Sequence, residues 1–227
     1  MLAQDYGAPI AGLLWYQGEN NRGQDADTYR AALAGVIANF RQDLGNPDLF
    51  VASCQLAALP GPTTQEQHAW MEIREGQRRY ALADPRSVLV ATIDLPTLGF
   101  HLFGSGYREV GRRLGVATLR ALYRRPGRTG PVVQRIRRFS LGTRMRIRYD
   151  RAVTGGDDPS LFRVVDQGVE VAVTLAAARG RSVTLRLERP VTDTALVTYG
   201  LREGGGPWLA GKRGEGAALL FLDVGLE

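Results

Sequence analysis

The sequence predicts an α/β protein whose first part is a parallel sheet covered by helices and whose second part is a small antiparallel β-sandwich. Two observations lead to this fold class. Short apolar runs alternate with segments of helical periodicity up to about residue 124, whereas short runs of alternating polar and apolar residues follow from about residue 129. We therefore expect two domains, residues 1–128 and residues 129–227.

Three continuously apolar runs predict the strands of the parallel sheet. They are residues 12–18, 49–56 and 87–94, and each lacks the polar–apolar alternation of a strand with one wet face. We expect them to be buried on both faces. Because such strands are joined by right-handed crossovers, helices should cover both sides of the sheet.

Helical periodicity fills the segments that follow these strands. Apolar residues recur at helical spacing over residues 29–44 behind a cap at Asp27 or Thr28, and again over residues 70–82 after a loop around residues 60–62. A third helix is expected from Ser105, as its N-cap, to about residue 124. The predicted order is β-α-β-α-β-α.

Polar residues follow each predicted strand at its carboxyl end. Ligands of parallel sheets bind beyond these ends, so the residues should line one crevice. They are Gln17, Gly18 and Glu19 after the first strand, Gln55 after the second, and Asp94 with His101 after the third.

The second domain is predicted from seven short runs separated by turn residues. This number and spacing of strands favour two packed antiparallel sheets. The runs are VVQRIRRF, RMRIRY, FRVVD, VEVAVTL, SVTLRL, ALVTYG and AALLFLDV.

Composition excludes several classes of protein. With 227 residues, 44% of them hydrophobic and 23% charged, the chain has the composition of a folded globular protein. No run approaches the ~20 apolar residues of a membrane span. The single cysteine, Cys54, excludes an internal disulfide framework and a multi-cysteine zinc site, and only two histidines are present. We expect no metal and no cofactor.

The net charge of +6 is concentrated in the second domain, between Arg135 and Arg151. Within this stretch, arginines alternate with apolar residues from Arg144 to Tyr149, as in a strand with one solvated face. A solvated strand is our preferred interpretation, and a patch for an anionic ligand is the alternative. Exposed aromatic residues do not interleave with these arginines, so we expect no nucleic-acid partner.

One block resembles a known family. Residues 15–21, WYQGENN, are similar to the WYQGExN block of the sialate O-acetylesterase family of SGNH (GDSL-like) hydrolases. The resemblance continues through Thr92-Ile93-Asp94, His101 and residues 107–114, and more weakly through residues 197–200 and 207–208. It covers nearly the whole chain.

The resemblance implies a three-layer α/β/α SGNH-hydrolase-like domain that removes acetyl groups from sugar hydroxyls by serine-nucleophile acyl transfer. In this interpretation His101 is the general base, and Asp94 or a backbone carbonyl orients it. Gln17 and Gly18 lie on the oxyanion side, and Glu19 orients them by hydrogen bonds. The candidates for substrate contact are Asn20, Asn21 and Gln55.

The nucleophilic serine of the family lies in a GQSN-like block before the WYQGE block, and no serine of this chain stands in such a context. We therefore expect the chain to be a fragment that lacks the serine, with an N-terminally incomplete sheet and an exposed edge strand. The alternative is a non-catalytic carbohydrate-binding or pseudoenzyme module. Residues 1–10 show no signal peptide. For the complete protein we expect a periplasmic or extracellular location, and the sequence predicts neither the acetylated sugar nor the oligomeric state.

Overall fold

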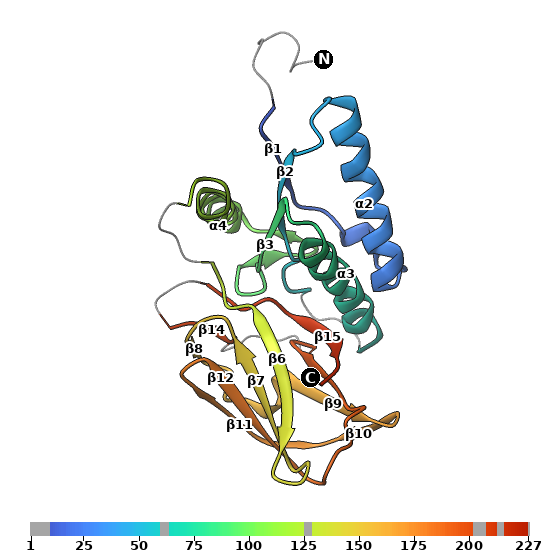
Figure 1. The fold of residues 1–227 in the computed structure, drawn as a ribbon, viewed down its shortest axis with the longest axis vertical. Coiled ribbons are helices and arrows are strands. Elements are labelled where there is room, and N and C mark those ends of the chain that lie inside the picture. The colour runs from blue at the N-terminus through green and yellow to red at the C-terminus, as the bar shows by residue number, and fades with distance from the viewer. Residues whose placement is uncertain (1–9, 60–63, 125–128, 202–207, 213–215, 227) are drawn as a thin grey trace.

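The computed structural model describes residues 10–59, 64–124, 129–201, 208–212 and 216–226. The start of the chain, the expected loop at residues 60–62, the residues just before the expected domain boundary at 128, and Pro207 lie outside these ranges. Figure 1 shows an α/β part, which holds the N-terminal half, above a part made of antiparallel strands. No helix in the described ranges is long and apolar enough to cross a membrane.

The α/β part contains the predicted parallel sheet. Its strands are β1 (Gly12–Trp15), β2 (Phe50–Cys54) and β3 (Ser87–Val90), in the order β1-β2-β3. Both neighbouring pairs are parallel, with Leu14 opposite Ala52 and Ala52 opposite Val88. Each strand is shorter than predicted, because its last residues turn away from the sheet to form loops.

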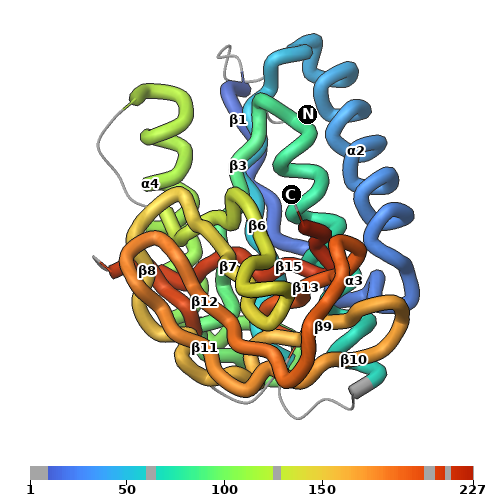
Figure 2. Tube along the Cα trace, turned by 60° about the horizontal axis from the view of Figure 1, so that its bottom comes forward, coloured from blue at the N-terminus to red at the C-terminus, as the bar shows by residue number. Residues whose placement is uncertain are grey.

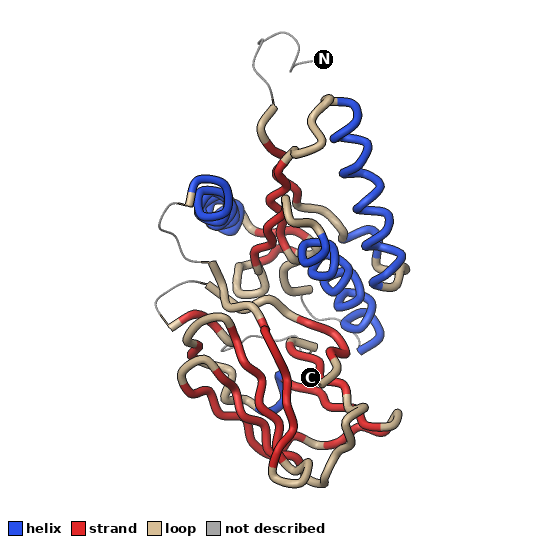
Figure 3. Tube along the Cα trace, viewed as in Figure 1, coloured by secondary structure: helices blue, strands red, loops and turns tan. Residues whose placement is uncertain are grey.

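Three helices pack on the sheet: α2 (Ala26–Asp43), α3 (Thr64–Ala83) and α4 (Gly104–Tyr123). The first two share a hydrophobic cluster with one face of the sheet, and this cluster includes Ile37, Trp70 and Val51. The third packs on the opposite face, where Leu114 joins a cluster with Ala52. Figure 3 shows the helices on either side of the strands.

Two predicted helix starts were wrong. The N-cap of α2 is Asp25, whose carboxylate accepts a hydrogen bond from the backbone N–H of Thr28 at 2.7 Å, rather than Asp27 or Thr28. The N-cap of α4 is Phe103, and Ser105 lies inside the first turn. An N-cap needs an extended backbone one residue before the helix, and in α4 an aromatic residue occupies that position without a side-chain cap.

Strand β1 is not buried on both faces, contrary to the prediction. Its Leu13 and Trp15 pack against the α2 and α3 side, but Leu14 on the opposite face is 66% exposed. The reason is that α4 packs on β2 and β3. Among the described residues β1 pairs with β2 alone, so its other edge and its α4-side face are open.

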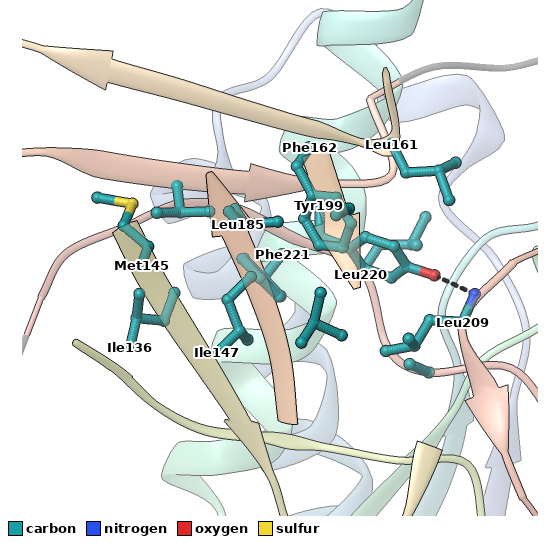
Figure 4. Close-up of a cluster of buried hydrophobic side chains, with 14 of the residues drawn as sticks. Ile136, Met145, Ile147, Leu161, Phe162, Leu185, Tyr199, Leu209, Leu220 and Phe221 are labelled. Carbon is teal, nitrogen blue, oxygen red and sulfur yellow. Dashed lines mark hydrogen bonds between the residues drawn. The ribbon is translucent and has the colours of Figure 1, made fainter. Parts of the chain in front are cut away.

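The second part consists mainly of two four-stranded antiparallel sheets, with strand orders β10-β9-β13-β15 and β11-β12-β7-β6. Their inward side chains form one hydrophobic cluster, which includes Met145, Leu185 and Phe221 (Figure 4). The strands are β6 (Val133–Phe139), β7 (Arg144–Tyr149), β9 (Phe162–Asp166), β10 (Val169–Val171), β11 (Val173–Arg179), β12 (Ser182–Leu187), β13 (Leu196–Tyr199) and β15 (Phe221–Val224), with β8 (Val153–Thr154) and β14 (Ala210–Gly211) paired beside them.

One predicted strand divides between the two sheets. The run VEVAVTL becomes β10 and β11, and the chain crosses from one sheet to the other at Ala172. The alternation of apolar residues continues through this crossing, and for that reason the pattern did not reveal it. Figure 2 shows the chain passing between the two sheets.

The two parts are joined by hydrogen bonds to the backbone near β15. The buried amide of Gln55 donates to the carbonyl oxygens of Arg74 at 3.1 Å and Leu220 at 2.8 Å, and its oxygen accepts from the N–H of Leu220 at 2.8 Å. The buried carboxylate of Glu75 accepts from the N–H of Leu222 at 3.2 Å. The hydrophobic cluster of the β-strands also extends to Met71 of α3.

Candidate active site

The turn after β1 is fixed by the conformation of Gly18. Its φ of 145° lies in the region that favours glycine, and a Cβ atom here would come within 2.8 Å of Ile73 Cγ2. The preceding carbonyl oxygen, of Gln17, accepts hydrogen bonds from Tyr29 Oη and Gln77 Nε2, both at 3.0 Å. Two helices therefore hold the backbone at which β1 ends.

A single turn of 3-10 helix, η1 (Glu19–Asn21), follows at once. Gln17 donates from Nε2 to Asn21 Oδ1 at 2.7 Å, and the N–H of Asn21 donates to the carbonyl oxygen of Gly18 at 2.9 Å. These bonds close the turn on itself. As a result Glu19 is buried, whereas Asn20 is exposed.

A short hairpin after β3 carries the second half of the site. Its strands are β4 (Thr97–Leu98) and β5 (His101–Leu102), with Leu98 opposite His101, so Gly99 and Phe100 form a two-residue turn. Gly99 has a φ of 61°, as the first central residue of a type II′ turn requires. The turn reverses the chain, and this reversal places His101 beside η1.

The structure brings His101 and Glu19 together. Glu19 Oε1 lies 3.5 Å from His101 Nδ1; the carboxylate is 11% exposed and the imidazole 69% exposed. A carboxylate beside Nδ1 orients the ring and favours the tautomer that carries its proton on Nδ1, which leaves Nε2 free to accept a proton. The pair can therefore act as an oriented general base.

Asp94, expected beside His101, has another partner. Its two carboxylate oxygens accept from Arg113 Nη1 at 2.7 Å and from Nη2 at 2.6 Å. Arg113 also donates to the carbonyl oxygen of Ala91 at 2.8 Å and to Glu109 at 3.0 Å. Asp94 thus ties the loop after β3 to α4, and the acidic residue beside His101 is Glu19.

Gln55, expected to contact substrate, lies away from the surface. It is 1% exposed, and both hydrogens of its amide are donated to backbone carbonyls. The prediction placed it correctly after β2, but the β-rich part covers this strand end. The prediction that Gln55 lines the crevice was therefore wrong, because the β-rich part packs over the carboxyl end of β2.

Aromatic residues at the rim of the site were not singled out from the sequence as a group. The guanidinium of Arg22 lies over the ring of Phe100, 4.9 Å from its centroid, and the ring centroids of Phe100 and Trp70 are 6.2 Å apart. The rings of Tyr16 and Tyr107 meet edge to face, with their centroids 6.5 Å apart. The sequence feature that could have indicated this role of Phe100 is its position directly before His101. In a two-residue turn, this position places the ring of Phe100 close to the site.

The described residues contain all six serines of the chain, and among them no serine side chain hydrogen-bonds His101. Ser53 is buried in β2, and Ser87 donates to carbonyl oxygens at the end of α3. The thiol of Cys54 is also buried, and burial raises its pKa to about 12. The histidine–glutamate pair therefore stands without a nucleophile in the described part of the chain.

Comparisons with known proteins identify the family of the chain. Residues 2–120, more than half of the chain, match the family described as SASA, carbohydrate esterase, sialic acid-specific acetylesterase. A solved structure of a carbohydrate acetylesterase from Xanthomonas citri is similar, with a TM-score of 0.76 and 24% sequence identity over 94% of this chain. This likeness shows the fold. The chain spans about half the length of that protein, since the match covers 50% of it.

A second solved structure, the N-terminal part of the bacterial S-layer protein SbsC, has a TM-score of 0.29 and 12% identity over 77% of this chain and 34% of its own, and it carries no argument. The search of curated proteins gives no match. The family match places the chain in the class of carbohydrate esterases, which are hydrolases. Within that class, it belongs to the sialic acid-specific acetylesterase family.

Proposed function

We propose that this chain carries the base half of a carbohydrate O-acetylesterase site, and that a serine outside the chain completes it. His101 is the general base and Glu19 is the residue that orients it. The observation that carries the proposal is the distance of 3.5 Å between Glu19 Oε1 and His101 Nδ1, beside a turn that only glycine fits. The match of residues 2–120 to the acetylesterase family supports the substrate class.

The reaction proceeds in two steps, transfer of the acetyl group to the serine and hydrolysis of the acetyl-serine. His101 Nε2 takes the proton of the serine hydroxyl as its oxygen attacks the acetyl carbonyl; the C–O bond to the sugar then breaks, and the sugar oxygen receives that proton. Water, deprotonated by the same nitrogen, next attacks the acetyl carbonyl of the acetyl-serine. The C–O bond to the serine then breaks, acetate is released, and the serine oxygen receives the proton from His101. The N–H of Gly18 and the amide of Gln17 are the candidate donors to the negatively charged oxygen of each tetrahedral intermediate.

The open side of β1 is where we place the serine-bearing segment. The chain passes from β1 through α2 to β2, which puts α2 on one face of the sheet by the right-handed crossover rule. Suppose that an added strand pairs with the free edge of β1 and that the chain continues from it to a further strand on the side away from β1. The right-handed crossover between those two strands would then place its helix on the opposite face of the sheet, next to α4. Leu14 is 66% exposed on that face. Such an addition would give the three-layer SGNH-like domain and put a strand end beside Glu19.

Labelling with a fluorophosphonate tests whether the chain alone holds a complete site. This reagent reacts with a serine that a neighbouring base activates, and the intact mass reports the adduct. We expect no adduct on the folded chain, because no serine side chain forms a hydrogen bond with His101 in the described residues. An adduct mapped to a single serine, lost in His101→Ala, would show that the chain needs no added segment. The absence of an adduct in a form that includes the segment upstream of the chain would instead support a non-catalytic carbohydrate-binding module.

Substitutions in that longer form test the two residue roles. His101→Ala should lower kcat for acetate release by about 10²–10⁴-fold, the usual contribution of general base catalysis. Glu19→Gln should lower kcat strongly with little change in KM, because it removes the charge beside Nδ1. Asp94→Asn is the matched carboxylate control, and it should leave kcat nearly unchanged once the variant is shown to be folded. A larger loss for Asp94→Asn than for Glu19→Gln would reverse the assignment of the orienting residue.

A further inference from the structure

One face of the β-rich part carries a dense array of arginines. The sheet β11-β12-β7-β6 has its inner face in the hydrophobic cluster, so alternate residues of each strand point outward. The strand register aligns these outward residues in three rows of four. The rows are Leu175, Arg186, Arg144 and Phe139; then Ala177, Thr184, Arg146 and Arg137; then Arg179, Ser182, Arg148 and Arg135.

Seven of these twelve positions are arginines and none is acidic. In the part of the chain that the structure describes, none of the seven makes an ion pair or a side-chain hydrogen bond. Arginines elsewhere do: Arg41 pairs with Asp84 at 2.8 Å, and Arg113 pairs with Asp94 at 2.6 Å. The abundance of arginine in the sequence therefore does not explain this face, because the acidic partners found elsewhere are missing from it.

The arrangement is electrostatically unfavourable in the free protein. Three cross-strand pairs set arginine directly opposite arginine: Arg135 with Arg148, Arg137 with Arg146, and Arg144 with Arg186. Like charges directly opposite one another destabilise an antiparallel sheet. The guanidinium of Arg146 in addition lies 5.0 Å from the ring centroid of Phe139, within the range of a cation–π contact. A bound polyanion would relieve the repulsion on all three pairs at once.

We propose that this arginine face, defined by the seven residues above, binds an anionic polysaccharide. Outward residues repeat at about 6.6–6.8 Å along a strand and about 4.8 Å between strands, so the face is a regular two-dimensional array of cations. A linear sugar polymer with a carboxylate or sulfate on each repeat can contact several arginines in succession, and guanidinium groups bind such oxyanions in bidentate pairs. The choice of a carbohydrate rests on the proposed function.

Other polyanions fit the face less well. Proteins that bind single-stranded nucleic acid combine cations with exposed aromatic rings on which bases stack, and the only aromatic residue in the three rows is Phe139, beneath Arg146. At one end of the face a cavity of about 420 Å³ adds Arg181 to Arg135 and Arg148. The acidic residue in its lining, Asp150, is already paired with Arg151, so it does not neutralise these arginines.

Binding of polygalacturonate to the chain, measured by titration calorimetry across a range of salt concentrations, tests the proposal. Pectin with its carboxylates fully methyl-esterified is the matched neutral probe. The face variant is Arg144→Gln/Arg146→Gln/Arg148→Gln, and the charge-matched control is Arg30→Gln/Arg86→Gln/Arg112→Gln, which removes three exposed arginines from the α/β part. If the face variant does not fold, Arg137→Gln/Arg146→Gln replaces it, with Arg30→Gln/Arg86→Gln as its control.

We expect the chain to bind polygalacturonate and not the esterified pectin. The face variant should weaken binding about ten-fold or more and reduce the slope of log K against log salt by about three, because each arginine that contacts an anion releases a counterion. The control variant should bind like the wild type. Polygalacturonate should also raise the Tm of the wild type more than that of the face variant.

Equal weakening in the face and control variants would show that net charge alone drives binding, and would overturn the proposal. So would equal binding of the esterified pectin, no binding of polygalacturonate, or tighter binding of an oligothymidylate or of phosphatidylglycerol vesicles. None of these measurements requires a serine or any turnover. A negative binding result therefore does not affect the acetylesterase proposal. A negative result in the esterase tests likewise does not change how the binding measurements are interpreted.

Discussion

At the scale of single residues, Gly18 sets the geometry of the site. Its φ of 145° is open to glycine, and the nearest atom to an added Cβ is Ile73 Cγ2 at 2.8 Å. We expect Gly18→Ala to lower the free energy of unfolding by at least about 1–3 kcal/mol, the cost of one residue held in a conformation it disfavours. Urea unfolding followed by circular dichroism measures this loss.

Gly23 provides the matched control for that substitution. It lies in the same connection between β1 and α2, and nothing lies within 4 Å of a Cβ added to it. Gly23→Ala should therefore not destabilise the protein, and the smaller conformational freedom of the unfolded chain can raise stability by about 0.4–1 kcal/mol. If both alanine variants unfold at the same urea concentration, the turn after β1 tolerates a side chain and the proposed rigidity of the site is wrong.

Sequence reasoning reached the two central residues of the site but not their pairing. Glu19 and His101 both follow apolar strands, so a shared crevice was predictable. The pairing depends on the two-residue turn at Gly99 and Phe100, which reverses the chain just before His101. Asp94, seven residues before His101, was expected to orient it, with a backbone carbonyl as the alternative. Its contact with Arg113 arises from the packing of α4, and a pattern of apolar residues carries no information about which polar side chains meet across such a contact.

At the scale of elements, α4 is held to the sheet by charge as well as by its apolar stripe. Hydrogen bonds from Arg112 and Arg113 lower the pKa of Glu109 from 4.5 to about 2. A carboxyl whose pKa falls on folding stabilises the protein above its unfolded pKa, and this contribution is lost as the pH falls from about 4.5 to about 2. The carboxylate is partly exposed, so solvent screening limits the contribution to about 1 kcal/mol or less at neutral pH.

We therefore expect Glu109→Gln to be less stable than the wild type at pH 7, with a difference that shrinks steadily between pH 4.5 and pH 3. Denaturant titrations at several pH values measure it. A difference between Glu109→Gln and the wild type that stays constant down to pH 3 would contradict the pairing of Glu109 with the two arginines.

Elements with a clear period were the most predictable. The three helices of the α/β part occur in the predicted segments, because 3.6-residue periodicity over segments as long as residues 29–44, 70–82 and 105–124 is hard to mistake. Their first residues were less predictable, since capping depends on the backbone before the helix and Asp25, Asp27 and Thr28 are all suitable cap residues. Strand β1 was predicted as buried because its composition is apolar. Its exposure depends on which strands and helices pack against it, and the sequence of one strand does not show which elements these are.

At the scale of the whole molecule, the open side of β1 is the feature with the largest consequence for behaviour in solution. In the described part of the chain, the outer edge of β1 is unpaired and lies beside the exposed Leu14, an arrangement that favours association between copies. We expect the chain to self-associate with rising concentration and Leu14→Lys to reduce that association. Light scattering after size-exclusion chromatography measures both.

Leu82→Lys is the control for this substitution. Leu82 is 63% exposed, close to the 66% of Leu14, but it lies near the end of α3 rather than on the sheet. Association should therefore persist in Leu82→Lys. A wild-type chain that remains monomeric at high concentration, or equal effects of the two lysines, would show that the edge of β1 does not drive contact between copies.

The buried amide of Gln55 has a consequence for how proteins of this architecture can be recombined. It binds both the N–H and the carbonyl oxygen of Leu220, which lies 165 positions later in the sequence. An exchanged β-rich part would have to present a backbone group of each kind at the same place, or leave the amide unsatisfied in the interior. The α/β part and the β-rich part are therefore constrained to change together at this contact. A chimera in which one part comes from a distant relative must keep Gln55, Glu75 and the segment around β15 from the same protein.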